Sequence, residues 1–310
     1  MISASRASLT RVHTLSSAAM RLVISLAFAC FLAQAANAQL QVELKFKRLQ
    51  YIAHEPLYAT VKITNHAGRD VDLHDQDGQH WFGFEVTAGE NQLIAPARPQ
   101  EPEPSLHIGS GQTVTRKINL TPVYPVHDFG TYHVRGNIFF ADLNKFFYSQ
   151  TKVFQVTDAR AIWQRTVGIP DGQPGAGETR TYSLLSNRFA DHTSLYVRVE
   201  DKSRGVVFNT YSLGRVIAFD EPQAELDRAN QLHVLHCSAP QTWSYSHIDL
   251  NGALVKRSTF MQTKSQPRLR HAANGAIAVH GGMLDQPSPK SAQNTAPKLS
   301  ARPPAVPEDE

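Results

Sequence analysis

The chain has 310 residues, a formal net charge of +4 at pH 7 and only two cysteines. No long run of lysine and arginine is present, so the charge gives no reason to expect nucleic acid as a partner. Two cysteines cannot build a disulfide framework, so stability has to come from burial of a hydrophobic core, for which the length is ample.

The first segment, residues 1–38, contains arginines, no acidic residue and an apolar run over residues 22–36. That run is shorter than the roughly 20 residues that span a bilayer. Ala36 and Ala38 are small residues that fit a signal-peptidase site before Gln39. The segment therefore predicts a secretory signal peptide, a periplasmic or extracellular location and no stable membrane span after cleavage.

Two alternatives stay open for this segment. Met20 directly precedes an arginine, so the chain could start there, and Cys30 lies in the apolar run, where a lipoprotein would carry its lipid. Cleavage after Ala38 would leave Cys237 as the single cysteine and a net charge of about +1. The basic character of the whole chain is thus partly a property of the export signal.

Residues 39–158 show short alternating segments separated by turns, which predicts a first all-β domain. The clearest segment is residues 57–64, where apolar and polar side chains alternate as in a half-buried strand. Residues 65–68 are small or turn-forming, and the alternation resumes at residues 71–73. We therefore expect a hairpin here.

A short motif in this domain resembles a known fold. Residues 128–134 read Asp-Phe-Gly-Thr-Tyr-His-Val and resemble the Asp-x-Gly-x-Tyr-x-Cys pattern that begins strand F of immunoglobulin-like domains. Tyr132 stands at the position of the tyrosine corner, and Val134 replaces the cysteine. The resemblance implies a disulfide-free immunoglobulin-like β-sandwich over residues 39–158 and carries no function with it.

Residues 159–177 are rich in proline and glycine toward their end, which predicts a linker. Residues 178–283 follow as a second β-rich domain with about three repeated segments, each a polar approach followed by a short apolar strand. The repeats are marked by Leu195, Leu232 and Ile277. They are similar to β-propeller blades, but a closed propeller needs four or more. The proline-rich residues 284–310 predict a disordered tail.

The common catalytic signatures are absent from the sequence: it has no nucleophile elbow, zinc-peptidase motif or phosphate-binding loop. We therefore expect no catalytic residue, no cofactor and no enzyme activity. The best metal-binding fragment is residues 233–237, which hold His233, His236 and Cys237. On a strand, His233 and Cys237 face one side and His236 the other, so the fragment alone predicts no metal site. Further ligands would have to come from elsewhere, with His247, His271 and His280 as candidates.

The candidate ligand-binding residues are Trp243, Tyr245 and His247, which share one face of a predicted strand. Rings aligned in this way can form a flat platform for a sugar or a peptide. The alternative is that they belong to the core.

These features favour an exported, non-catalytic binding or assembly module of a bacterial-type envelope. Its partner would be a protein or a glycan, bound by the aromatic platform or by an open strand edge. One alternative is a secreted hydrolase that gathers Asp191, Asp227 and Asp249 in the second domain. Another is a proteinase-inhibitor-like sandwich that presents the proline-rich loop over residues 96–104.

Overall fold

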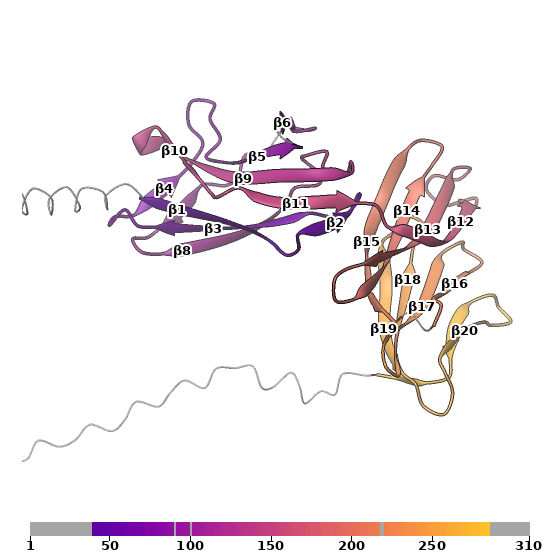
Figure 1. The fold of residues 1–310 in the computed structure, drawn as a ribbon. Helices are drawn as coiled ribbons and strands as arrows, with labels where there is room; N and C mark the ends of the chain where they lie inside the picture. Colours follow the sequence, from indigo (N-terminus) through magenta and orange to yellow (C-terminus); the bar gives the residue numbers. More distant parts are fainter. Residues whose placement is uncertain (1–38, 90, 100, 218–219, 286–310) are drawn as a thin grey trace, which may run out of the picture. The chain divides into compact units, whose positions relative to one another are not determined.

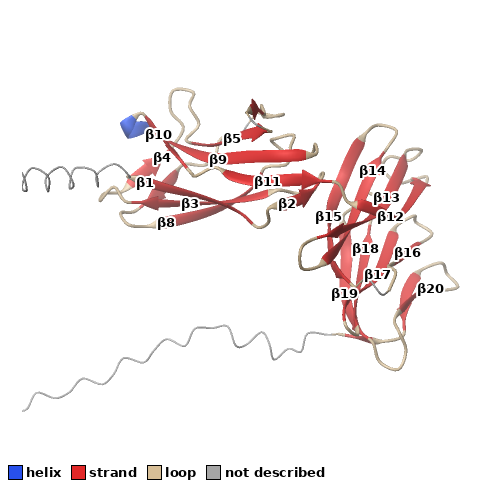
Figure 2. Ribbon diagram, in the orientation of Figure 1, coloured by secondary structure: helices blue, strands red, loops and turns tan. Residues whose placement is uncertain are grey.

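The computed structural model describes residues 39–285 except 90, 100, 218 and 219 (Figure 1). In this part of the chain the regular structure is β-strand, apart from one 3-10 turn at Ala141–Leu143 (Figure 2). The all-β prediction is confirmed. The predicted signal peptide, residues 1–38, and nearly all of the predicted tail, from residue 286 onward, lie outside the described residues.

The chain divides into two compact units. Unit 1 contains residues 39–50, 57–126 and 130–155, and unit 2 contains residues 51–56, 127–129 and 156–285. The main boundary falls three residues before the position at which the sequence predicts the first domain to end. Two short segments from the first part of the sequence nevertheless belong to unit 2.

Unit 1 is built on two main antiparallel sheets. One has the order β1 (Leu40–Phe46), β3 (Tyr58–Asn65), β8 (Thr113–Asn119). The other has the order β2 (Gln50–Ile52), β11 (Lys152–Thr157), β9 (Gly130–Phe140), β5 (Phe82–Ala88), β6 (Gln92–Leu93). β10 (Lys145–Tyr148) also pairs with β9. Residues 51–52 of β2 and 156–157 of β11 are assigned to unit 2. The rings of Phe46 on β1 and Phe154 on β11 lie 5.1 Å apart, and Tyr132 stacks on Phe154. Aromatic side chains from both sheets thus fill the core.

The predicted hairpin between residues 57–64 and 71–73 is wrong. Strand β3 pairs with β1 on one side and with β8 on the other, so neither of its edges is left for β4 (Val71–Leu73). β4 pairs with β7 (Leu106–Ile108) instead. The buried amide of Asn65 donates to the carbonyls of Arg69 and Ile108, which directs the chain away from β3.

Unit 2 also contains two main antiparallel sheets. The first is β12 (Arg160–Gly168), β13 (Thr179–Arg188), β14 (Thr193–Asp201), β15 (Val206–Val216). The second is β16 (Gln223–Leu226), β17 (Leu232–Ala239), β18 (Thr242–Ile248), β19 (Leu254–Met261), β22 (Met283–Leu284). A separate hairpin joins β20 (Arg268–His271) to β21 (Ile277–His280).

The predicted linker over residues 159–177 needs correction, because β12 occupies residues 160–168 and pairs with β13 along its length. The proline and glycine residues that suggested a linker are confined to the loop after β12. The predicted tail also begins inside structure, since Leu284 belongs to β22. The three repeat markers Leu195, Leu232 and Ile277 lie on β14, β17 and β21, in sheets of four, five and two strands.

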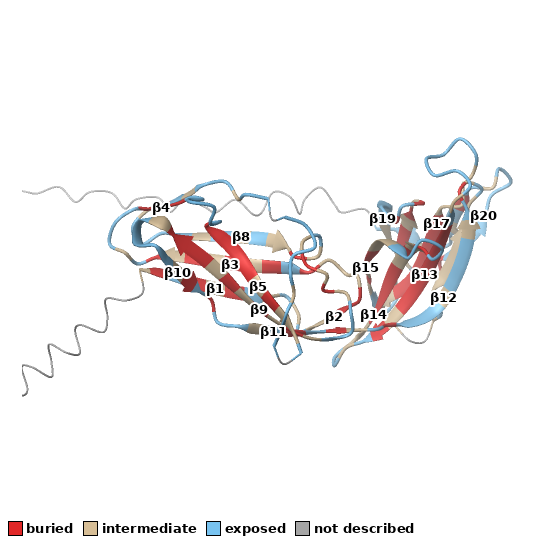
Figure 3. Cartoon of the chain, turned by 90° about the horizontal axis from the view of Figure 1, so that it is seen from above, coloured by how far each residue is buried: buried red, intermediate tan, exposed pale blue. Residues whose placement is uncertain are grey.

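In the second sheet of unit 2, the central strands β17 and β18 carry buried side chains on both faces, whereas β19 is exposed or half-buried (Figure 3, coloured by burial). On one face, Leu232, Val234 and Ile248 pack against side chains of β13, β14 and β15. On the other face, Leu235, Cys237, Trp243 and Tyr245 pack against Leu269 and Ile277 of the β20–β21 hairpin. A strand buried on both faces loses the alternation of apolar and polar residues, as β17 does.

Candidate functional sites

The predicted aromatic platform is not an exposed surface. Trp243, Tyr245 and His247 do share one face of β18, as their spacing predicts, but the side chains of Trp243 and Tyr245 are only 1% and 8% exposed. The β20–β21 hairpin covers them with Leu269 and Ile277. The platform prediction is therefore wrong for these two residues, and the alternative that they belong to the core is correct.

His247 has a different environment. It lies directly across from His233 in the β17–β18 ladder, and the two imidazole rings stack with centroids 4.3 Å apart and planes inclined by 11°. His233 is 5% exposed and His247 is half-buried. The Nε2 atom of His247 lies 2.6 Å from Oε1 of Gln231. The register of one hairpin thus brings together two histidines that are 14 positions apart in the sequence.

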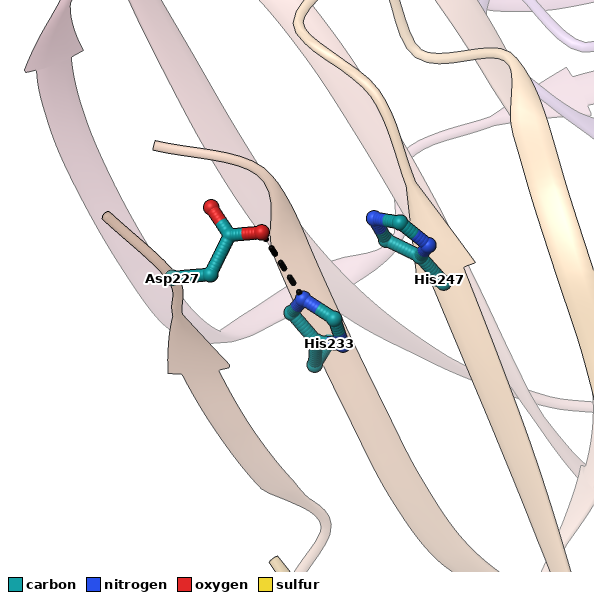
Figure 4. A group of neighbouring side chains, drawn as sticks. All are labelled: Asp227, His233 and His247. Carbon is teal, nitrogen blue, oxygen red and sulfur yellow. Dashed lines mark hydrogen bonds and ion pairs between the residues drawn. The ribbon is translucent and has the colours of Figure 1, made fainter. Parts of the chain in front are cut away.

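Asp227 completes this histidine cluster, which we define as Asp227, His233 and His247 (Figure 4). The residue follows β16 and closes the turn to β17, because its Oδ1 accepts hydrogen bonds from the backbone N–H groups of Ala229 and Gln231. Its other oxygen, Oδ2, lies 3.3 Å from Nε2 of His233. One donor atom from each of the three residues lies within 4.8 Å of the other two.

Hydrogen bonding and burial both act on His233. Its Nδ1 lies 2.7 Å from the hydroxyl of Tyr245, which fixes the orientation of the ring. Burial lowers the pKa of His233, and the bond to Asp227 opposes that shift only in part. The imidazole is therefore neutral near pH 7, the form in which a ring nitrogen can bind a cation. Just outside the cluster, Nε2 of His271 lies 3.3 Å from Oε2 of Glu225, which is across the ladder from His233.

The other residues of the metal-binding fragment do not join this cluster. His236 faces the opposite side of β17, as the strand spacing predicts, and Cys237 packs in the apolar cluster under the β20–β21 hairpin. From the sequence, His247 is named as a candidate ligand beside His233, but Asp227 is named only as an acid of the hydrolase alternative. The available signal was the turn after Asp227, which returns the chain to His233 only six positions later.

The three acids of the hydrolase alternative serve separate local structures. Asp191 bonds to the neighbouring His192 at 2.8 Å, and Asp249 accepts two backbone hydrogen bonds within its own turn, from Asn251 and Ala253. Of these three acids, Asp227 is the one whose carboxylate lies beside two histidines, His233 and His247. The three carboxylates therefore have different roles in the local structure.

The proline-rich loop of the inhibitor alternative is tied to the sandwich. The carbonyl of Glu103 accepts a hydrogen bond from the indole of buried Trp81, and its carboxylate lies 3.2 Å from Arg116. The N–H of Ala97 donates to the carbonyl of Val123. Bonds at both ends of the segment hold it against unit 1.

A second candidate site in unit 1 is a groove of about 530 Å³ beside β1. Among the described residues β1 pairs only with β3, so its other edge is open. The β1 groove is lined by residues 40–45 of that edge and by Tyr148, Gln150 and Lys152.

Along β1, the backbone N–H and C=O groups of successive residues point alternately toward β3 and toward this groove. The N–H of His66 donates to the carbonyl of Gln39, and the N–H of Asn65 points the other way, toward Gln112 of the chain leading into β8. With this hydrogen-bonding register, the N–H and C=O groups of every second β1 residue point away from β3. The residues concerned are Leu40, Val42 and Leu44. No described residue accepts or donates a hydrogen bond at these groups.

Comparison with known proteins gives little to add to this geometry. No family model matches the chain, and no curated protein matches it either. A solved structure that is similar in part is Spo0M, a sporulation control protein from Bacillus subtilis, with 10% sequence identity. The similarity covers 55% of this chain and 83% of that one, at a TM-score of 0.28. In the described part of the chain no helix is long and apolar enough to cross a membrane.

Proposed function

We propose that the protein is an exported, non-catalytic binding module that takes up an extended polypeptide segment of a partner protein along the open edge of β1. Export is supported by the signal-like sequence of residues 1–38. The observation that carries the binding proposal is the β1 groove, where the edge of a sheet faces a cavity of about 530 Å³.

Backbone pairing explains why the partner segment would be extended. The outward N–H and C=O groups of Leu40, Val42 and Leu44 repeat every second residue, which matches the hydrogen-bonding period of an added strand. The side chains of Tyr148 and Lys152 on the opposite wall can then contact the side chains of the segment. Main-chain bonds would supply affinity and these walls would supply selectivity.

A polypeptide is favoured over a glycan because the rings that would stack on a sugar are buried beneath the β20–β21 hairpin. The hydrolase and inhibitor alternatives have no comparable support. Asp191 and Asp249 make local bonds, and the proline-rich loop is held against the sandwich through Glu103.

The experiment selects binders from a displayed library of random eight-residue peptides and measures their affinity for the purified chain. Val42→Pro removes one outward N–H from β1, so we expect it to weaken the selected peptides at least tenfold. Thr115→Pro is the matched control, because residue 115 directs its N–H outward from β8 at the opposite edge of the same sheet.

Hydrogen exchange identifies the bound edge directly. A bound peptide should slow amide exchange at Leu40, Val42 and Leu44 and leave the outer edge of β8 unchanged. Equal loss of affinity in the two proline variants, or protection confined to unit 2, would rule out the β1 groove as the site.

A further inference from the structure

The histidine cluster in unit 2 lies outside the β1 groove and has a chemistry of its own. It combines two imidazoles with one carboxylate, and one donor atom of each side chain lies within 4.8 Å of the others. Nitrogen ligands favour zinc and related transition metals over calcium or magnesium, which bind oxygen ligands. The set of two histidines and one carboxylate matches a zinc ligand set.

The fold places all three side chains on short, well-bonded elements. Cross-strand pairing in the β17–β18 ladder fixes His233 beside His247. Asp227 is fixed by the two backbone hydrogen bonds to its Oδ1, which leave Oδ2 directed at His233. A cation would therefore meet a carboxylate whose position is already set by the turn.

The outer hydrogen bonds match the requirements of a histidine ligand. The Nδ1 atom of His233 contacts the Tyr245 hydroxyl at 2.7 Å, so a proton held on Nδ1 would leave Nε2 free to bind a metal. Without a metal, the hydroxyl can donate to Nδ1 while Nε2–H donates to Asp227. A change of tautomer, with no change in net charge, is enough to convert the ring into a ligand.

Metal binding would also require one ring to move. Four ligands at about 2.0–2.1 Å around zinc lie about 3.3 Å from one another, which is closer than the separation of up to 4.8 Å in the cluster. Stacked rings inclined by only 11° cannot both direct an in-plane lone pair at the same ion. His247 is less buried than His233, so its ring is the one that can rotate, at the cost of its bond to Gln231.

We propose that Asp227, His233 and His247 bind one zinc ion, with rotation of the His247 ring away from Gln231 and a water or the Gln231 amide oxygen as the fourth ligand. The ion links the β16–β17 turn to β18. It is a stabilising or regulatory ligand of unit 2, separate from peptide binding at β1.

The test is isothermal titration of the purified, untagged full-length chain with zinc sulfate, together with thermal melting. We expect one zinc per chain and a higher melting temperature. His247→Gln and Asp227→Asn should each weaken binding at least tenfold. Asparagine keeps a side-chain oxygen to cap the turn, and residue 247 is only half-buried, so both variants should fold.

The matched control is His271→Gln, which removes an exposed histidine beside the cluster without removing a proposed ligand. Cobalt(II) in place of zinc should give the strong visible absorption of a four-coordinate site with nitrogen ligands, and His247→Gln should abolish it. Absence of stoichiometric zinc binding would overturn the proposal, as would undiminished binding in His247→Gln. An equal loss in His271→Gln would overturn the three-residue assignment.

Discussion

At the scale of single residues, His236 is the most unusual buried group. Its side chain has no exposed surface, and neither ring nitrogen has a hydrogen-bond partner among the described residues, although the backbone of Arg215 lies near the ring. Burial, assisted by the charge of Arg257, lowers the pKa of His236 to about 4. An imidazole held neutral in this way has to accept a proton when the chain unfolds in mild acid.

This predicts a pH dependence of stability. The unfolded chain binds the proton near pH 6.5 and the folded chain only near pH 4, so the contribution of His236 is complete above pH 6.5 and is lost as the pH falls toward 4. The loss amounts to roughly 3 kcal/mol. Urea unfolding at pH 7.5 and pH 4.5 measures it, and His236→Asn should reduce the difference by about that amount.

The companion variant for that measurement is His54→Asn, because the pKa of His54 is also lowered to about 4 by burial, so His54 adds its own pH-dependent contribution. Asparagine suits the left-handed backbone of residue 54, where φ is 65°. Because the two pKa values are lowered alike, each single variant should remove its own share of the pH dependence, and the share of His236 should survive in His54→Asn. Equal slopes in the wild type and His236→Asn would show that His236 is not the group responsible.

Tyr245 provides a second test at this scale, and it concerns the proposed zinc ion. Tyr245→Phe keeps the ring that packs against Leu235 but removes the hydroxyl that contacts Nδ1 of His233. Loss of such an outer hydrogen bond reduces metal affinity about 10- to 100-fold. Zinc titration should show that reduction with little change in the melting temperature of the metal-free chain. Unchanged affinity would mean that the hydroxyl does not orient the ligand.

At the scale of strands and hairpins, the sequence predicts local alternation correctly but not the partners of each strand. The period of two correctly placed Trp243, Tyr245 and His247 on one face of β18. Whether that face meets water depends on the β20–β21 hairpin, whose contacts come from about 30 residues further along the chain. The histidine cluster was missed for the same reason, since the distance from Asp227 to His233 and His247 depends on the turn and the strand register together.

The covering role of this hairpin predicts the effect of changing its apolar side chain. Leu269 is buried against the core around Trp243, whereas its neighbour Arg270 is exposed on the same strand. Leu269→Ala should lower the free energy of unfolding by about 2–5 kcal/mol, while Arg270→Ala should change it little. Chemical unfolding measures both. Hydrogen exchange in β18 should accelerate only in Leu269→Ala, and its failure to do so would mean that the hairpin does not protect that face.

At the scale of the whole molecule, the two units are not two consecutive stretches of sequence. Residues 51–56 belong to unit 2 although they lie between β1 and β3 of unit 1. Ile52 packs with Ala159, Leu185 and Tyr196, and the carbonyl of Ala53 accepts a hydrogen bond of 2.7 Å from Arg198. Composition marks the end of a domain well, but it has no signal for a short segment that crosses into another core.

This arrangement predicts that Ile52→Ala acts on unit 2. The side chain is 1% exposed, so its truncation should cost about 2–5 kcal/mol and should speed amide exchange in β13 and β14, which carry Leu185 and Tyr196. Ile63→Ala is the matched control, because Ile63 is equally buried but lies on β3 in unit 1, and its truncation should speed exchange in β1 and β8. Hydrogen exchange with mass spectrometry resolves the two patterns in one experiment. If Ile52→Ala instead loosened β3 and left β14 protected, residues 51–56 would belong to the core of unit 1.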